Sequence, residues 1–284
     1  MEQFESVISV AQSVELIQAR INKRKALAVT GRRVRRSLVQ QDSPTKDMDA
    51  LMLGDALVGY GNNMSLNNMA IMENLMTMAM MEANFEVPGG KNTRAWYDAF
   101  IQCLQDLGCF VADDGYTRYS ESSRRVDMDF VISDIVKGII DGVKASVPAA
   151  TVLGTVVSTT IDGLKRDEET MRLFNSQVKV AEGARLSVIP CEQLANGILI
   201  ASSTSIKQSG TSSNGGVLFV NWQSSAREIF RGKSFVTFNP ARYEEFRQDI
   251  EEYLGVHRRE VLSRRFSRRK PKVRFMIPTV PGSL

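Results

Sequence analysis

The stretch ASVPAATVLGTVVSTTI, residues 145–161, has no charged side chain, although 24% of this 284-residue chain is charged. A helix that crosses a lipid bilayer needs about 20 predominantly apolar residues. The stretch is shorter than that, and it contains Pro148, Gly154 and several serine and threonine residues. It is therefore too short and too polar for a permanent transmembrane helix. It predicts either a core helix or a segment that enters a membrane after a rearrangement.

The residues on both sides of Pro148 predict a helical hairpin. Apolar residues recur at three- and four-residue steps from Val131 to Val143, which is the period of one helix face. Proline fits the first position of a helix, where its missing N–H is not needed. We therefore expect helices over 128–147 and 149–164. If this hairpin enters a membrane, the residues expected to interact with it are Val147, Val152, Leu153, Val156, Val157 and Ile161.

Charge is distributed unevenly along the chain. Residues 1–36 carry 8 basic and 3 acidic side chains, and residues 257–284 carry 9 and 1, whereas the middle carries 19 and 28. Basic ends attract phosphate backbones, anionic lipid or acidic protein surfaces. They can also be solvated tails, or they can fold back onto the acidic body of the same chain or of a neighbouring subunit. The candidate anion-binding residues are Lys23, Arg24, Lys25, Arg32, Arg33, Arg35, Arg36, Arg264, Arg265, Arg268, Arg269 and Lys270.

The first part of the chain reads mainly as helices. An amphipathic helix is predicted over roughly 3–28, and its run into basic residues suits peripheral binding to an anionic membrane. A methionine-rich helix over 64–85 suits either a core or a surface that repacks against partners. Further elements expected here are a short helix over 47–60, a helix that Thr93 caps and Gly108 ends, and a loop or short hairpin over 109–125 with its turn at Asp114–Gly115.

Beyond Asn175 the pattern changes to short β-branched and aromatic segments that glycines punctuate, which is typical of strands. At least four strands, expected to be antiparallel, precede a last helix that opens at Asn239–Pro240. The fold class predicted is α+β, with a helical N-terminal half followed by a small antiparallel β domain and a C-terminal helix. The domains expected are an amphipathic helix and basic arm over 1–41, a helical domain over 42–174, a β domain with its helix over 175–262, and a basic mobile tail over 263–284.

The sequence motifs of common catalytic and metal sites are missing from the chain. The chain has one histidine, His257, and it contains no CxxC pair, no GxxxxGK[ST] loop and no GxGxxG motif. Its three cysteines are expected to be reduced and buried thiols. We therefore expect no enzyme activity, no cofactor, no metal site and no small-molecule substrate.

Two hypotheses of function follow from these patterns. The first is a non-enzymatic, self-assembling protein that engages membranes in the manner of a pore-forming or insecticidal toxin component. The alternative is a structural or assembly subunit, of a virion or sheath-like particle, whose basic arms bind neighbouring subunits or nucleic acid. A homo-oligomer is expected in either case. The first 20 residues lack the basic and apolar blocks of a signal peptide, so synthesis in the cytoplasm is expected, followed by release or by association with a membrane.

Overall fold

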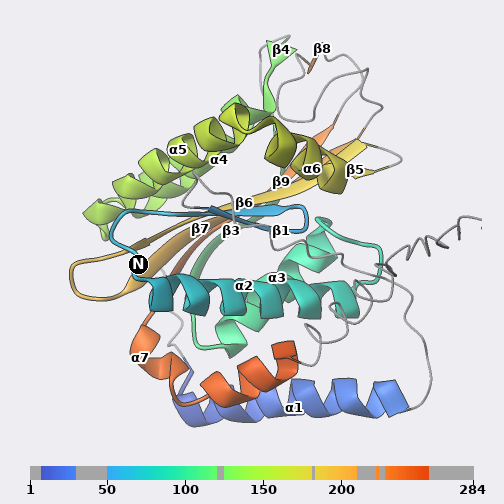
Figure 1. Cartoon of the computed structure of the whole chain (residues 1–284), viewed down its shortest axis with the longest axis vertical. Coiled ribbons are helices and arrows are strands. Elements are labelled where there is room, and N and C mark those ends of the chain that lie inside the picture. The colour runs from blue at the N-terminus through green and yellow to red at the C-terminus, as the bar shows by residue number, and fades with distance from the viewer. Residues whose placement is uncertain are drawn as a thin grey trace, which may run out of the picture.

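A twisted β-sheet lies at the centre of the molecule, between two layers of helices (Figure 1). The computed structural model describes residues 8–29, 50–119, 125–180, 183–209, 222–223 and 228–255. Within these residues the main sheet has seven strands, in the order β1-β2-β6-β7-β9-β3, with β5 paired to β6. Its strands are β1 (Ala50–Leu53), β2 (Ala56–Tyr60), β3 (Phe110–Tyr119), β5 (Lys179–Val180), β6 (Gly183–Gln193), β7 (Leu199–Ser209) and β9 (Ile229–Phe238). A two-stranded pair is formed by β4 (Arg125–Val126) and β8 (Trp222–Gln223).

The strand pairing joins the two halves of the chain into one sheet. The long strands β6, β7 and β9 are antiparallel neighbours, as expected for the second half. However, β2 pairs parallel with β6, and β3 pairs antiparallel with β9. Strands from both halves therefore share the same hydrogen-bonded ladder. The coarse prediction of mixed helices and strands, with most helices before the long strands, is confirmed.

The short helix predicted over 47–60 is wrong, because residues 50–60 form the β1–β2 hairpin. Leu53 pairs with Ala56, and Gly54 occupies the turn with a φ of 67°, which favours glycine. Every residue of β2 is buried, since helices cover both faces of the sheet. An apolar run without alternation does not distinguish a buried strand from a buried helix.

The loop or hairpin predicted over 109–125 is also wrong, because β3 is one continuous strand from Phe110 to Tyr119. Gly115 has a φ of 77°, and the register with β9 shifts between Asp113 and Tyr116. The Asp-Gly pair therefore marks a β-bulge, which uses the same positive φ as a tight turn.

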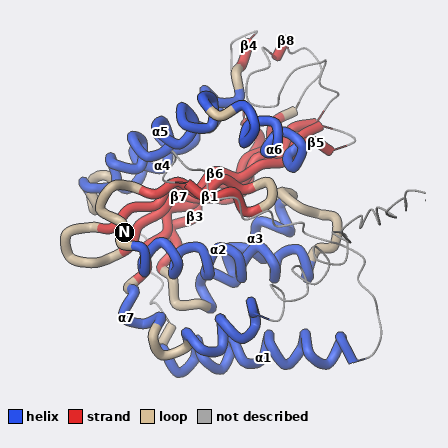
Figure 2. Tube along the Cα trace, viewed as in Figure 1, coloured by secondary structure: helices blue, strands red, loops and turns tan. Residues whose placement is uncertain are grey.

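Helices cover the sheet in layers (Figure 2). One face carries α4 (Met128–Val143), the 3-10 helix η1 (Pro148–Thr151), α5 (Val152–Arg166) and α6 (Glu168–Val178). The other face carries α2 (Leu66–Glu86) and α3 (Arg94–Asp106). Beyond these two lie α1 (Val10–Val29), α7 (Pro240–Tyr243) and the helical residues 247–255. The sheet thus separates two hydrophobic cores, one under each helical layer.

The ends of these helices follow local sequence signals. The hydroxyl of Thr93 accepts from the N–H of Trp96, and Gly108 follows α3 with a φ of 82°, so both predicted boundaries are confirmed. Asn239 caps α7 as predicted, but a turn at 244–246 separates α7 from the helical residues 247–255. The methionine-rich helix α2 is buried on almost all sides, because it lies between the sheet and the outer layer. The predicted tail over 263–284 lies outside the described residues.

Candidate functional site: the docked helical hairpin

The uncharged stretch forms the second arm of a helical hairpin, as predicted. Helix α4 ends at Val143, and Pro148 begins the 3-10 turn that leads into α5. Leu153, Val157 and Ile161 pack into the core between the hairpin and the sheet. In the conformation described here the stretch is therefore a core helix.

The predicted membrane residues divide into two groups. Leu153, Val156, Val157 and Ile161 are buried, with no side chain more than 4% exposed. Val147 and Val152, near the hairpin turn, are partly buried against the same core. The structure thus brings most of these residues onto one face of α5, and they would become accessible only if the hairpin left the sheet.

Helix α5 approaches strand β2 very closely at one point. A β-carbon added at Gly59 would lie 2.1 Å from the Thr160 hydroxyl oxygen and 3.1 Å from the Thr160 β-carbon. No side chain fits in that space, so glycine at position 59 allows the helix to sit directly on the strand. This contact fixes the depth at which α5 docks.

The polar contacts between α4 and the sheet are weak. Arg231 of β9 pairs with Asp134 of α4 at 3.9 Å, which is at the limit of an ion pair. The Ser202 hydroxyl on β7 is fully buried and has no hydrogen-bond partner in the described part of the chain. Ser202 is an even number of residues from Ile200 and Ile206, which pack into the hairpin core, so it lies on the same face of β7, the face that α4 covers. A buried hydroxyl without a partner costs about 1–3 kcal/mol.

The outer face of α5 is weakly polar. Thr155, Ser158 and Thr159 are exposed, and the Thr159 hydroxyl donates to the backbone oxygens of Thr155 at 2.7 Å and Val156 at 3.1 Å. A hydroxyl that bonds its own helix needs no water partner, so such a surface tolerates an apolar environment. Within the described ranges, no helix is long and apolar enough to cross a membrane.

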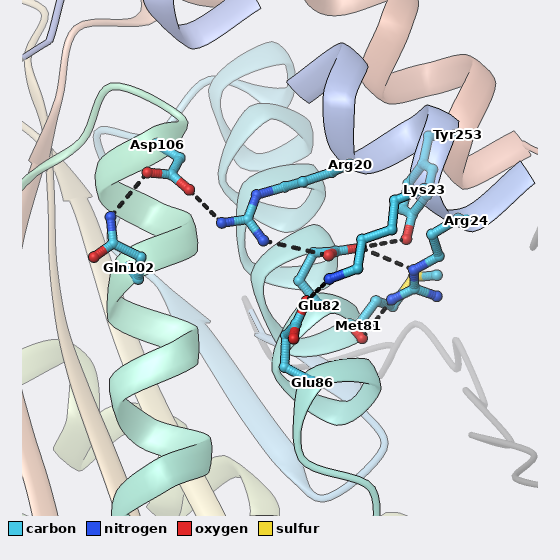
Figure 3. Close-up of polar contacts among 9 residues, drawn as sticks. All are labelled: Arg20, Lys23, Arg24, Met81, Glu82, Glu86, Gln102, Asp106 and Tyr253. Atoms are coloured by element: carbon cyan, nitrogen blue, oxygen red, sulfur yellow. Dashed lines mark hydrogen bonds and ion pairs between the residues drawn. The ribbon is translucent and has the colours of Figure 1, made fainter. Parts of the chain in front are cut away.

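A second polar cluster holds the outer layer on the opposite side of the sheet (Figure 3). Glu82 of α2 is 1% exposed, and it accepts hydrogen bonds from Arg24 at 2.9 Å, Tyr253 at 2.7 Å and Arg20 at 3.3 Å. Arg20 also pairs with Asp106 of α3. Burial raises the pKa of Tyr253 far above its usual range, so its hydroxyl stays protonated and donates to the carboxylate. This cluster fastens α1 and the helical residues 247–255 to α2.

Two of the predicted anion-binding residues therefore already bind carboxylates of the same chain. Arg24 pairs with Glu82, and Lys23 pairs with Glu86 at 2.6 Å. This arrangement corresponds to the alternative in which the basic N-terminal segment folds back onto the acidic body. The side chain of Lys25 and the residues Arg32, Arg33, Arg35, Arg36, Arg264, Arg265, Arg268, Arg269 and Lys270 lie outside the described part of the structure.

Sequence reasoning missed the residues that set how the hairpin docks. Gly59 and Ser202 belong to strands of opposite halves of the chain, and neither was assigned a role. The run SSTS at 202–205 was a visible signal, because four consecutive hydroxyl residues are unusual in a buried strand. All four are buried in the structure.

Comparisons with known proteins give remote matches in structure. No family model and no curated protein matches the sequence. The activated Cyt2Ba monomer from Bacillus thuringiensis subsp. israelensis is 15% identical, with a TM-score of 0.35 over 64% of this chain and 95% of that chain. A delta-endotoxin is 14% identical (TM-score 0.38, 72% and 88% covered), and the Evf virulence factor is 9% identical (TM-score 0.33, 84% and 88% covered). At such low TM-scores these similarities assign no activity to this chain.

Proposed function

We propose that this protein is a non-enzymatic, self-assembling protein that engages membranes by releasing the hairpin of α4 and α5 from its sheet. The observation that carries the proposal is the docking of this hairpin. Its apolar face packs with sheet residues into one core, while the ion pair from Arg231 to Asp134 is 3.9 Å long and the buried Ser202 hydroxyl beneath the hairpin has no partner in the described part of the chain. Such an interface depends on burial of apolar surface rather than on specific polar contacts.

Apolar burial makes the docking depend on the surrounding medium. Exposing a buried Val, Leu or Ile side chain to water costs about 1.5–3 kcal/mol. Leu153, Val156, Val157 and Ile161 are buried on α5, and several apolar residues of α4 pack beside them. In water the hairpin therefore stays docked. Beside a bilayer the same side chains can be buried in lipid, so this term no longer opposes release.

Release of the hairpin also opens two buried polar groups of the sheet to water. The Ser202 hydroxyl and the Arg231 Nε are buried without a hydrogen-bond partner in the described structure. Both lie on the face that the hairpin covers, since Arg231 reaches Asp134 of α4. When the hairpin leaves, water can bind both groups, and this hydration offsets part of the cost of opening.

The opposite side of the molecule is held far more firmly. The buried carboxylate of Glu82 binds Arg20, Arg24 and Tyr253. Removing a partner from such a buried cluster is costly, because a charge is then left in a low-dielectric site. The hairpin, rather than α1, is therefore the element that we assign to the membrane.

Association between hairpins would follow their insertion. A β-carbon added at Gly154 of α5 would lie 3.5 Å from the Ile140 side chain of α4, which is an ordinary van der Waals distance. The two helices therefore already pack closely on each other. Small and hydroxyl residues on α5 permit the same close approach between copies in lipid, where helix association depends on packing. The proposal therefore includes an oligomer that forms on the membrane.

Dye release from anionic and neutral vesicles tests the proposal, together with light scattering on the same samples. The decisive variant replaces two exposed hydroxyl residues on α5, Thr155→Glu with Ser158→Glu. The matched control places the same added charge on other exposed positions, Gln18→Glu with Ser176→Glu. Neither variant alters a buried side chain, so both should keep the wild-type circular dichroism and Tm.

We expect the wild type and the control to release dye and to form a larger species on vesicles. The Thr155→Glu, Ser158→Glu variant should fail, because two carboxylates on the uncharged face oppose transfer into lipid. Wild-type protein that neither binds vesicles nor releases dye would refute the proposal. Equal dye release by both variants would show that the hairpin is not the membrane element.

A further inference from the structure

Three cations that form no ion pair with a carboxylate of the described residues lie near an aromatic pair on the α3 side of the sheet. Arg185 of β6 and Lys207 of β7 are direct cross-strand partners. Lys207 in turn stands opposite Phe230 of β9, whose ring stacks on Tyr116 of β3 at 6.1 Å with an interplanar angle of 3°. Arg94, the first residue of α3, donates to the Tyr116 backbone oxygen at 2.6 Å. These residues come from five elements, β3, β6, β7, β9 and α3, that meet at one end of the sheet.

The loop before α3 closes this end of the sheet. The Asn92 side chain donates to the backbone oxygens of Leu186 and Ile206, both at 3.2 Å, so it bridges β6 and β7 one residue from the two cations. The Tyr116 hydroxyl donates to the Asn92 backbone oxygen at 2.5 Å. Arg185 donates through Nη1 to the Gly89 backbone oxygen at 3.1 Å. The strand backbones that carry Arg185 and Lys207 are therefore held together by Asn92.

The charges here are unbalanced. Like charges directly opposite each other in an antiparallel pair are destabilising. Arg94, Arg185 and Lys207 have no ion pair to any carboxylate in the described residues, and the Arg185 Nε is buried with no hydrogen-bond partner there. The nearby carboxylates are already taken, since Asp55 pairs with Lys91, and Glu228 pairs with Arg118 at 3.4 Å. An anion bound between these cations would remove the repulsion.

We propose that Arg94, Arg185 and Lys207 form a binding site for a phosphate group. Guanidinium groups match phosphate oxygens in geometry and bind them through charge-assisted hydrogen bonds. The half-buried ring of Phe230, which stacks on the buried Tyr116, provides an apolar surface beside the cations for the organic part of a phosphate ester. The site lies across the sheet from the hairpin, and it does not require hairpin release.

Thermal unfolding of the full chain in phosphate and in chloride, at equal ionic strength and pH 7.5, tests the site. The variant is Arg185→Gln with Lys207→Gln. The matched control is Lys137→Gln with Lys144→Gln, which removes the same charge from exposed positions of α4. Arg94→Gln, at an exposed position, provides a second variant that leaves the strand pair unchanged.

We expect phosphate to raise the Tm of the wild type and of the control. Because a hydrogen bond to a charged group contributes about 1.5–3 kcal/mol, the Arg185→Gln, Lys207→Gln variant should need at least about tenfold more phosphate for the same shift. In chloride alone it should be at least as stable as the wild type, because the like-charge pair is gone. The proposal would be overturned if phosphate did not raise the Tm of the wild type. It would also be overturned if phosphate raised the Tm of all the proteins equally, as a general salt effect does.

Vesicles containing phosphatidic acid then identify the source of the phosphate. Flotation of the wild type, but not of the Arg185→Gln, Lys207→Gln variant, would assign the site to a lipid phosphate. A Tm shift with inorganic phosphate and no difference in flotation would assign it to a soluble phosphate compound. Either result supports the site, and neither depends on dye release.

Discussion

Gly59 of β2 and Thr160 of α5 lie so close together that a β-carbon at Gly59 would stand 2.1 Å from the Thr160 hydroxyl oxygen. Gly59→Ala should therefore destabilise the protein by about 1–3 kcal/mol through overpacking. Adding Thr160→Ala, which removes the hydroxyl oxygen and the γ-methyl group but keeps the β-carbon at 3.1 Å, should recover part of that loss. Urea unfolding of the two single variants and the double variant measures the coupling. Strictly additive effects would contradict the contact.

The control for this contact is a glycine with open space. A β-carbon at Gly142 of α4 meets no atom within 4 Å. Gly142→Ala should therefore raise stability by up to about 1 kcal/mol, as in an exposed helix. If Gly59→Ala behaved like Gly142→Ala, α5 would not sit on β2 as described.

The second prediction concerns the buried hydroxyl of Ser202. Ser202→Ala should leave the free energy of unfolding unchanged or raise it by about 1 kcal/mol, because the hydroxyl has no partner in the described residues. The control is Thr204, two residues along β7, whose hydroxyl donates to the Val188 oxygen at 2.9 Å and accepts from the Val188 N–H at 3.0 Å. Thr204→Val should cost about 1–3 kcal/mol, since it leaves that N–H without a partner. A loss on Ser202→Ala as large as that on Thr204→Val would show that Ser202 is satisfied.

The third prediction separates a buried carboxylate from an exposed one. Glu82→Gln should lower the free energy of unfolding by about 3 kcal/mol or more, because Arg20 and Arg24 lose a buried partner. Glu86→Gln, one turn further along α2, breaks the exposed pair with Lys23 and should cost less than about 1 kcal/mol. Denaturant titration of both variants measures the difference. If both variants lost a similar free energy of unfolding, the two carboxylates would lie in equivalent environments, which would contradict the burial found here.

The fourth prediction concerns the cysteines, which are buried and free, as expected. Burial raises the pKa of Cys109 to about 12, and it raises those of Cys103 and Cys191 further. At pH 8 roughly one Cys109 thiol in ten thousand is ionised, so a disulfide reagent should find almost no thiolate in the folded protein. All three thiols should react once the protein is unfolded in denaturant. Rapid reaction of any thiol without denaturant would contradict this burial.

Elements with strong local signals could be predicted from the sequence. The helical hairpin of α4 and α5 could be predicted from the period of its apolar residues and from Pro148. Helix α3 could be predicted from its cap Thr93 and from Gly108 at its end. The β1–β2 hairpin was mistaken for a helix because it is apolar on both faces. The bulge at Gly115 was mistaken for a turn because both structures use glycine at positive φ. In each error the local signal was compatible with two structures, and the pairing of distant strands decided between them.

The contacts on which the proposed function rests could not be predicted, because they join distant parts of the chain. Glu82 lies 58 residues from Arg24 and 171 residues from Tyr253. Gly59 meets Thr160 only because β2 pairs with β6 beneath α5. Composition and charge showed that the N-terminal segment was basic, but they did not show which carboxylates it binds.

A disulfide between α5 and β2 tests whether the hairpin must leave the sheet to act, because it locks the hairpin onto the sheet. Gly59→Cys with Thr160→Cys places two β-carbons about 3.1 Å apart, which needs a few tenths of an ångström of relaxation to reach the usual range of roughly 3.5–4.5 Å. The native cysteines are buried free thiols, so a reductant should leave the wild type unchanged.

The measurement is dye release from anionic vesicles by the oxidised and the reduced double-cysteine protein. We expect the oxidised protein to release no dye and reduction to restore release to the wild-type rate. If the oxidised protein releases dye as fast as the reduced one, the hairpin does not leave the sheet to act, and the proposed function is wrong.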